Sequence, residues 1–213
     1  MPYRRTENVE RRLAARHAAI VAAAREAVSE GGMAAVQIAP VAQRAGIAAG
    51  TVYRYFPGKT DLIAAVLAEI SEREIGALRR AAANAPGPLS ALACVIMSFA
   101  ARALRHRRLA FAAVAEPVDA AVDPIRLKFR KLLADEFGMR IAAAIASGHL
   151  PEQDAMLAAV GVLGLLVEGT IGPLAPQSPG RELVQSLALT ALRALGLADP
   201  RARGLVVQTV IKD

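Results

Sequence analysis

The side chains with the clearest chemistry lie in a short block between residues 51 and 59. Thr51, Tyr53, Arg54, Tyr55 and Lys59 bring hydroxyl, phenol, guanidinium and ammonium donors close together in the sequence. Donors of these kinds bind phosphate oxygens and the edges of bases in DNA grooves. The block therefore indicates binding to nucleic acid.

The charge distribution agrees with this interpretation. The chain has 26 Lys and Arg against 19 Asp and Glu, a net charge of +7. Residues 1–60 hold nine basic and only four acidic side chains, so most of the excess lies there. A basic segment favours a polyanionic partner, although charge alone fits a solvated N-terminal tail equally well. We expect Arg4, Arg5 and Arg11 to follow a groove or the phosphates, and Gln43 and Arg44 to touch the DNA backbone.

The sequence offers few residues that could form a catalytic site or a metal site. The only histidines are His17, His106 and His149, and Cys94 is the only cysteine. No nucleophile stands beside a base at a catalytic spacing, and no two histidines have the spacing of metal ligands. We expect a protein that is not an enzyme and holds no metal or cofactor. The apolar window of Cys94 predicts a buried thiol in a reducing compartment.

The composition predicts an all-α protein. Hydrophobic residues make up 54% of the 213 residues and aromatic residues only 4%. Alanine, which is abundant, favours helix and disfavours strand. The charged N-terminus lacks a secretory signal. The longest uncharged apolar run, 155–167, is shorter than the roughly 20 residues that a membrane-spanning helix needs, so we expect a soluble cytoplasmic protein.

Apolar periodicity and Gly/Pro punctuation predict a series of helices. The expected ranges are 9–29, 38–44, 49–55, 59–83, 89–105, 109–115, 125–147, 151–170 and 181–195. The β-branched tail at 205–211 is compatible with either a strand or a frayed end.

Residues 38–55 have the pattern of a helix-turn-helix. Val41, Ala45, Ile47 and Val52 are apolar where two crossed helices must bury each other. Gly46 supplies the positive φ that a sharp turn between them requires. The second helix of such a unit lies in the major groove of DNA.

The segment 51–62 closely resembles the most characteristic part of the TetR family of transcriptional repressors. Tyr53, Phe56, Lys59 and Leu62 carry this resemblance, and the wider stretch 20–67 matches it too. The resemblance implies a homodimeric all-α regulator, with a DNA-binding domain at 1–60 and a ligand-binding and dimerisation domain at 61–213. The expected DNA contacts are Arg4, Arg5, Arg11, Gln43, Arg44, Ala49, Gly50, Thr51, Tyr53, Arg54, Tyr55 and Lys59.

Two residues depart from the family pattern. Ala48 stands where the family usually has a serine that caps the recognition helix, and Ala49 follows where a polar residue is common. Loss of such a cap costs about 1 kcal/mol. Ala48 also removes a hydroxyl that could bind phosphate, so affinity for DNA should depend more on the basic arm.

The rest of the chain has weaker candidates for ligand and subunit contacts. A ligand site is expected among the helices of 89–147. Its candidate residues are Met97, Phe99, Phe111, Glu116, Phe129 and Phe137. Gly161, Gly164, Gly169 and Gly172 lie on one side of an expected helix and favour close approach of another helix. With Leu183, Leu187 and Ala191 they are candidates for the dimer interface, the alternative being packing within the chain.

These observations predict a repressor that a small hydrophobic ligand releases from double-stranded operator DNA. The alternative is a helical small-molecule-binding protein without specific DNA recognition, which the change to Ala48 and Ala49 motivates.

Overall fold

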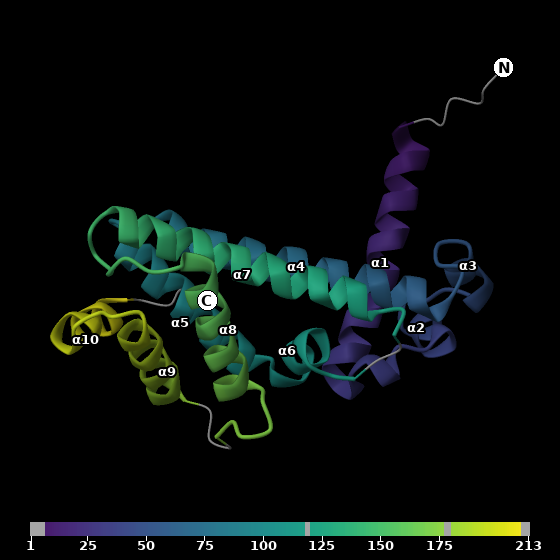
Figure 1. The fold of residues 1–213 in the computed structure, drawn as a ribbon. Coiled ribbons are helices and arrows are strands. Elements are labelled where there is room, and N and C mark those ends of the chain that lie inside the picture. Colours follow the sequence, from purple (N-terminus) through teal and green to yellow (C-terminus); the bar gives the residue numbers. More distant parts are fainter. Residues whose placement is uncertain (1–6, 118–119, 177–179, 210–213) are drawn as a thin grey trace.

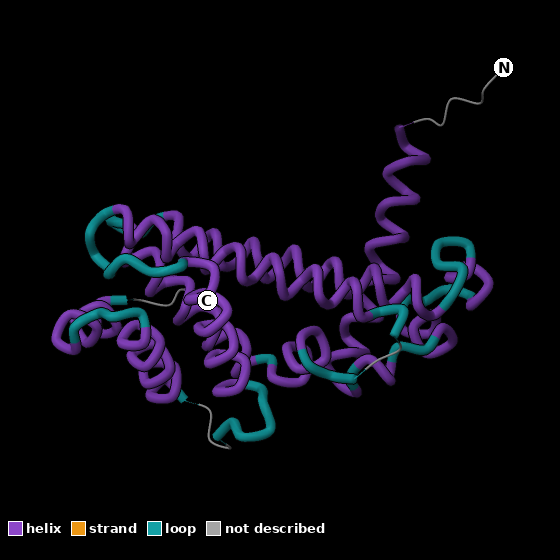
Figure 2. Tube along the Cα trace, viewed as in Figure 1, coloured by secondary structure: helices purple, strands orange, loops and turns teal. Residues whose placement is uncertain are grey.

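The computed structural model describes residues 7–117, 120–176 and 180–209. Within these ranges the chain consists of helices and loops, with no strand (Figure 2). The expected all-α class is confirmed. Arg4 and Arg5, expected to contact DNA, lie outside the described residues.

The elements follow the predicted order closely. They are α1 (Glu7–Gly31), the 3₁₀ helix η1 (Met33–Ala35), α2 (Ile38–Arg44), α3 (Ala49–Tyr53), α4 (Lys59–Ala83), α5 (Pro88–Arg105), α6 (Arg107–Val114), α7 (Asp123–Ala146), α8 (Ala155–Thr170), α9 (Arg181–Ala194) and α10 (Asp199–Gln208).

Three details differ from the sequence-based expectation. Helix α8 begins at Ala155 rather than Pro151, because the Asp154 carboxylate caps it by accepting hydrogen bonds from the N–H groups of Met156 and Leu157 at 2.9 and 3.0 Å. Gly172 consequently lies beyond the end of α8. The tail up to Gln208 is part of helix α10, because Ala202 and Val206, one turn apart, bury their side chains in the core, while residues 210 and 211 lie outside the described residues.

The helices form a long body with a small head at one end (Figure 1). Helices α4 and α7 run side by side along the body and contact each other, and both also contact α5. Helices α1, α2 and α3 form the head, while α9 and α10 lie at the far end. Helix α4 contacts α1 as well as α5 and α7, so it joins the head to the body.

The core is aliphatic and continuous from head to body. Ile20, Val41, Val52, Leu62 and Leu92 are all fully buried in one cluster. Burying each such side chain contributes roughly 1.5–3 kcal/mol relative to its exposure to water. Cys94 on α5 is half-buried rather than fully buried, and burial raises the pKa of its thiol.

Helix α5 is the one described helix that is long and apolar enough to span a membrane by length and composition. However, 61% of its apolar window is buried inside the protein, as expected for a core helix. The sequence had drawn attention instead to 155–167, which forms the shorter helix α8.

Candidate nucleic-acid interface

Helices α2 and α3 form the predicted helix-turn-helix. Val41 and Ala42 on α2 and Val52 on α3 are buried and hold the two helices together. Gly46 adopts a φ of +65° in the turn, as predicted, and the Ile47 N–H closes the turn by donating to the Ala42 carbonyl at 3.0 Å. Burying one face of α3 leaves its other face open to solvent.

The open face of α3 carries Gly50, Tyr53 and Arg54. Tyr53 is 54% exposed, and the adjacent Arg54 is exposed too. A Cβ added at Gly50 would meet nothing within 4 Å, so another molecule can come close to the backbone there. The spacing i, i+3 and i+4 places the three residues on one surface of the helix. This surface carries donors of the kinds that bind base edges and phosphates in a DNA groove.

The remaining residues expected in α3 and the next loop surround this face. Ala49, Thr51 and Tyr55 are half-buried, and Lys59 is exposed as the first residue of α4. Ala48 is the N-cap of α3 and makes no side-chain hydrogen bond, as its missing hydroxyl predicts. Phe56 is buried in the core.

The two neighbouring tyrosines have different environments. Tyr53 faces solvent, whereas the Tyr55 ring lies edge-on to His17 of α1, with centroids 6.4 Å apart. His17 also lies 4.9 Å from the buried ring of Phe56. These contacts fix the position of α1 against the end of the helix-turn-helix. Nothing in the sequence pattern pointed to His17, because the contact joins residues far apart in the chain.

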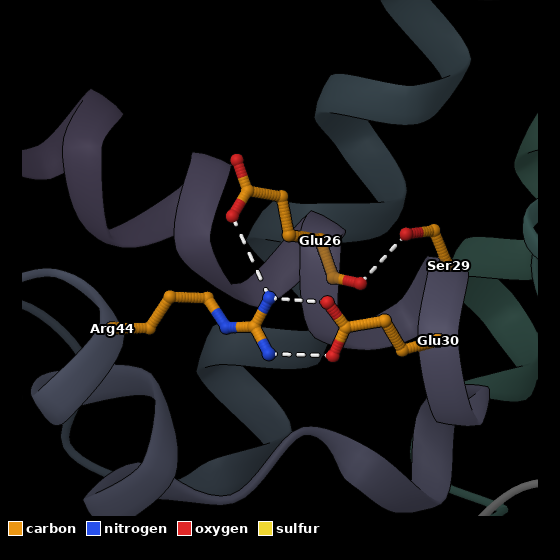
Figure 3. Close-up of polar contacts among 4 residues, drawn as sticks. All are labelled: Glu26, Ser29, Glu30 and Arg44. Atoms are coloured by element: carbon orange, nitrogen blue, oxygen red, sulfur yellow. Dashed lines mark hydrogen bonds and ion pairs between the residues drawn. The ribbon is translucent and has the colours of Figure 1, made fainter.

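Arg44 is engaged within the protein (Figure 3). Its two terminal nitrogens donate to the two carboxylate oxygens of Glu30 at 2.6 and 2.5 Å, and Glu26 lies 3.6 Å away. The guanidinium lowers the pKa of Glu30, and Glu30 raises the pKa of Arg44. Arg44 therefore ties the end of α2 to α1, and its expected contact with the DNA backbone stays a prediction. Gln43 beside it stays exposed.

Helix α1 continues beyond the head as a projecting arm (Figure 1). Arg11, Arg12 and Arg16 are exposed on this part of the helix. Arg11 donates to the Asn8 side chain at 2.9 Å, a contact between exposed groups that DNA can replace. The arm therefore carries exposed basic side chains, and the contact of Arg11 with DNA stays a prediction.

Glu116, expected in a ligand site, contacts the head of the protein. Its carboxylate accepts a hydrogen bond from the Met33 N–H at 3.0 Å, at the start of η1 in the head. Both carboxylate oxygens lie 2.6 Å from where a Cβ on Gly32 would be, and Gly32 has a φ of +72°. Glu116 therefore connects the body to the head. Sequence reasoning missed this because its partner is a backbone group 83 residues away.

The other ligand-site candidates lie in the body. Met97, Phe99, Phe129 and Phe137 are buried, and the rings of Phe99 and Phe137 meet edge to face with centroids 6.0 Å apart. Phe111 is half-buried on α6. Among the described residues, no group of three or more His, Cys, Asp or Glu side chains is placed to hold a metal ion.

The candidates for subunit contact divide into two groups. Gly161 and Gly164 are exposed on α8, with nothing within 4 Å of an added Cβ. Gly169, in contrast, packs against the Leu187 side chain of α9 in the same chain. Ala191 is fully buried, which corrects its assignment to a subunit interface, and Leu183 is half-buried.

Comparisons with known proteins fit this geometry. Residues 20–66 match the family model described as bacterial regulatory proteins, tetR family. Over 45 residues the chain is 53% identical to the HTH-type transcriptional repressor KstR of Rhodococcus jostii, covering 21% of each protein. The same repressor of Mycolicibacterium smegmatis is 51% identical over 45 residues, covering 21% of this chain and 22% of that protein. These matches span about a fifth of the relatives' length.

Solved structures resemble the whole chain. RolR in complex with resorcinol has a TM-score of 0.70 and 21% identity, covering 96% of this chain and 98% of that one. The transcriptional regulator FadR from Bacillus subtilis in complex with stearoyl-CoA has a TM-score of 0.61 and 20% identity, covering 90% and 98%. At these identities the likeness shows a common fold.

Proposed function

We propose that this chain is a member of the tetR family of bacterial regulatory proteins, whose family model matches residues 20–66, and that it is a transcriptional repressor that binds operator DNA as a homodimer. A small molecule bound in the helical body releases it from DNA. In this role it acts in the cytoplasm and catalyses no reaction. Residues 1–60 form the DNA-binding domain, and residues 61–213 form the domain for the ligand and the second subunit.

The observation that carries this proposal is the exposed face of α3. Tyr53 and Arg54 project from a helix whose opposite face is anchored by fully buried Val52. Arg54 suits the O6 and N7 atoms of guanine or a phosphate, and Tyr53 suits a phosphate or an apolar base edge. Thr51, Lys59 and Arg11 add backbone contacts around this face. The half-buried Ala49 and the open Gly50 let the DNA come close to the helix.

An apolar surface on α8 supports the proposed dimerisation. Leu157 is 71% exposed and Val160 is 54% exposed, and both lie beside the open glycines Gly161 and Gly164. A contiguous apolar face of this kind favours burial against another protein surface. A second copy of the same helix fits, because glycines allow two helix backbones to come close. The dimer then presents two α3 helices about 34–36 Å apart, one turn of DNA.

The alternative is a helical small-molecule-binding protein without specific DNA recognition. It is favoured by the uncapped α3 and by the engagement of Arg44 with Glu30, since both reduce the donors available to DNA. A repressor prefers one DNA sequence over others, whereas the alternative protein binds all DNA sequences equally. Both would have a positively charged surface.

Fluorescence anisotropy with DNA from upstream of the protein's own gene distinguishes them. We expect tight binding to a palindromic duplex and much weaker binding to a scrambled duplex of the same composition. Affinity should fall steeply with salt, because neutralised phosphates release counterions. Equal affinity for the two duplexes at moderate salt would exclude the repressor.

A further inference from the structure

Arg126 is a charged residue on the buried side of helix α7, which is mostly apolar. Its residue surface is only 8% exposed. Phe129, Leu133 and Phe137 form a buried stripe on the same side and are 3%, 0% and 0% exposed. An aliphatic side chain would fill such a position without cost, whereas burying a charge costs several kcal/mol unless it is well paired.

The guanidinium of Arg126 has few partners. Its Nη2 donates to the Ala112 carbonyl at 3.4 Å, a long hydrogen bond. Its Nη1 lies 3.7 Å from the Asp123 carboxylate, beyond hydrogen-bonding distance, and the Asp123 side chain is 63% exposed. The Nε atom is buried and has no hydrogen-bond partner. A guanidinium carries five N–H donors, so most of its capacity is unused.

Glu136, also buried on α7, is a charged residue with complete ion pairing. Glu136 is 2% exposed, and its carboxylate accepts from Arg79 at 2.6 Å and from Arg140 at 3.4 Å. Glu136 therefore forms an ion pair with Arg79 that links α7 to α4. Arg126 lacks an equivalent partner among the described residues, and burial lowers its pKa, which shows that its surroundings disfavour the charge.

We propose that Arg126 binds the anionic group of the small-molecule effector. A carboxylate can accept two parallel N–H donors from one guanidinium, and this charge-assisted geometry is the strongest that arginine makes. The bound anion takes the place beside Nη1 that Asp123 leaves incompletely filled. This inference rests on the proposed function, of which it names the ligand class.

The surroundings define the rest of the ligand. Phe129 and Leu133 lie one and two turns along the buried stripe, and α6 contributes the Ala112 carbonyl. The effector is therefore an amphipathic carboxylate, with an apolar part among these side chains. The Glu116 carboxylate contributes to the field at Arg126 and holds Met33 of the head. A bound anion repels Glu116, so it can weaken the link from body to head.

Calorimetric titration with a panel of carboxylates and their neutral analogues tests the inference. The panel pairs octanoate with octanol, decanoate with decanol, and benzoate with benzyl alcohol. The wild-type protein is compared with Arg126→Met and with Arg130→Met, whose exposed side chain lies one turn away on the same helix. A third variant, Asp123→Asn, removes the charge that competes for the guanidinium.

We expect at least one carboxylate to bind the wild-type protein about tenfold or more tightly than its alcohol, as a charge-assisted contact predicts. Arg126→Met should abolish this preference without lowering the melting temperature, since it removes an incompletely paired buried charge. Arg130→Met should retain the preference, and Asp123→Asn should strengthen it. The inference is overturned if no carboxylate in the panel binds, or if Arg126→Met keeps the preference.

DNA binding is measured separately on the same proteins without ligand. Palindrome-specific binding together with no Arg126-dependent carboxylate binding overturns this inference and leaves the repressor function standing. Carboxylate binding at Arg126 without any DNA sequence preference overturns the repressor function and leaves the anion site standing.

Discussion

The Glu116 carboxylate accepts a hydrogen bond from the backbone N–H of Met33 at 3.0 Å. This contact joins the loop after α6 to the first residue of η1, and so joins the body of the protein to its DNA-binding head. It depends on Gly32, where any side chain would collide with the Glu116 oxygens. The contact therefore couples the position of the loop after α6 to that of η1.

Removing the Glu116 carboxylate should destabilise the protein. We expect Glu116→Ala to lower the free energy of unfolding by about 1.5–3 kcal/mol, the range for a hydrogen bond to a charged group. Gly32→Ala should also destabilise it, through the positive φ and the clash with Glu116. Urea denaturation of both single variants and the double variant measures the coupling. In the double variant the added methyl group no longer meets the Glu116 carboxylate, so the loss of stability should be smaller than the sum of the two single losses. If the two losses simply add, Gly32 and Glu116 are not in contact.

The Arg44–Glu30 pair should make stability depend on pH. Arg44 holds the pKa of Glu30 below its ordinary value of 4.5 in the folded state. A carboxylate with a lowered folded pKa contributes stability above its unfolded pKa, and this is lost as the pH falls through the folded pKa. We expect wild type to exceed Glu30→Gln in melting temperature at neutral pH, with the difference shrinking below pH 4.5. A constant difference down to low pH would disprove the ion pair.

Tyr53 should contribute to DNA binding without contributing to the fold. Because Tyr53 is 54% exposed, we expect Tyr53→Ala to weaken palindrome binding about tenfold or more, corresponding to a lost contact of about 1–3 kcal/mol. The melting temperature should stay within about 1 °C, as for most exposed substitutions. Val52→Ala, at a fully buried neighbour, is the control and should lower the melting temperature. Unchanged DNA affinity of Tyr53→Ala would remove α3 from the interface.

Substitutions at two glycines of α8 should have different effects, one on dimerisation and the other on folding stability. A Cβ at Gly164 meets nothing within the chain, whereas one at Gly169 meets Leu187. We expect Gly164→Trp to give a folded monomer in sedimentation velocity, because a bulky side chain blocks the approach of a second α8. Gly169→Ala should instead lower the melting temperature through the α8–α9 contact. A dimer of unchanged affinity in Gly164→Trp would place the subunit interface elsewhere.

Cys94 should react slowly in the folded protein. Burial raises the pKa of its thiol above the ordinary value of 9.0, so the reactive thiolate is scarce at neutral pH. We expect alkylation by iodoacetamide to be about tenfold or more slower in the native protein than in denaturant, a range consistent with thiolate-controlled reactivity. Mass spectrometry follows the modified fraction over time. Equal rates would show that the thiol is freely exposed.

The sequence determined most of the local structure. Periodic apolar residues gave helices close to their observed bounds, and Gly46 marked the turn at which α2 and α3 meet. These features arise from interactions between near neighbours in the chain, so their signal is present in a short window. The block around Tyr53 and Lys59 was recognisable for the same reason.

Tertiary structure decided which polar groups remain available. Arg44, Arg54 and Arg126 have the same guanidinium, yet one is paired with Glu30, one is exposed, and one is buried with unused donors. The contact of Glu116 with Met33 and the full burial of Ala191 were likewise not indicated by the local sequence. Partners in these cases are distant in the chain and include backbone groups, which carry no side-chain signature. Burial and pairing are properties of the packed helices, and only packing could assign them.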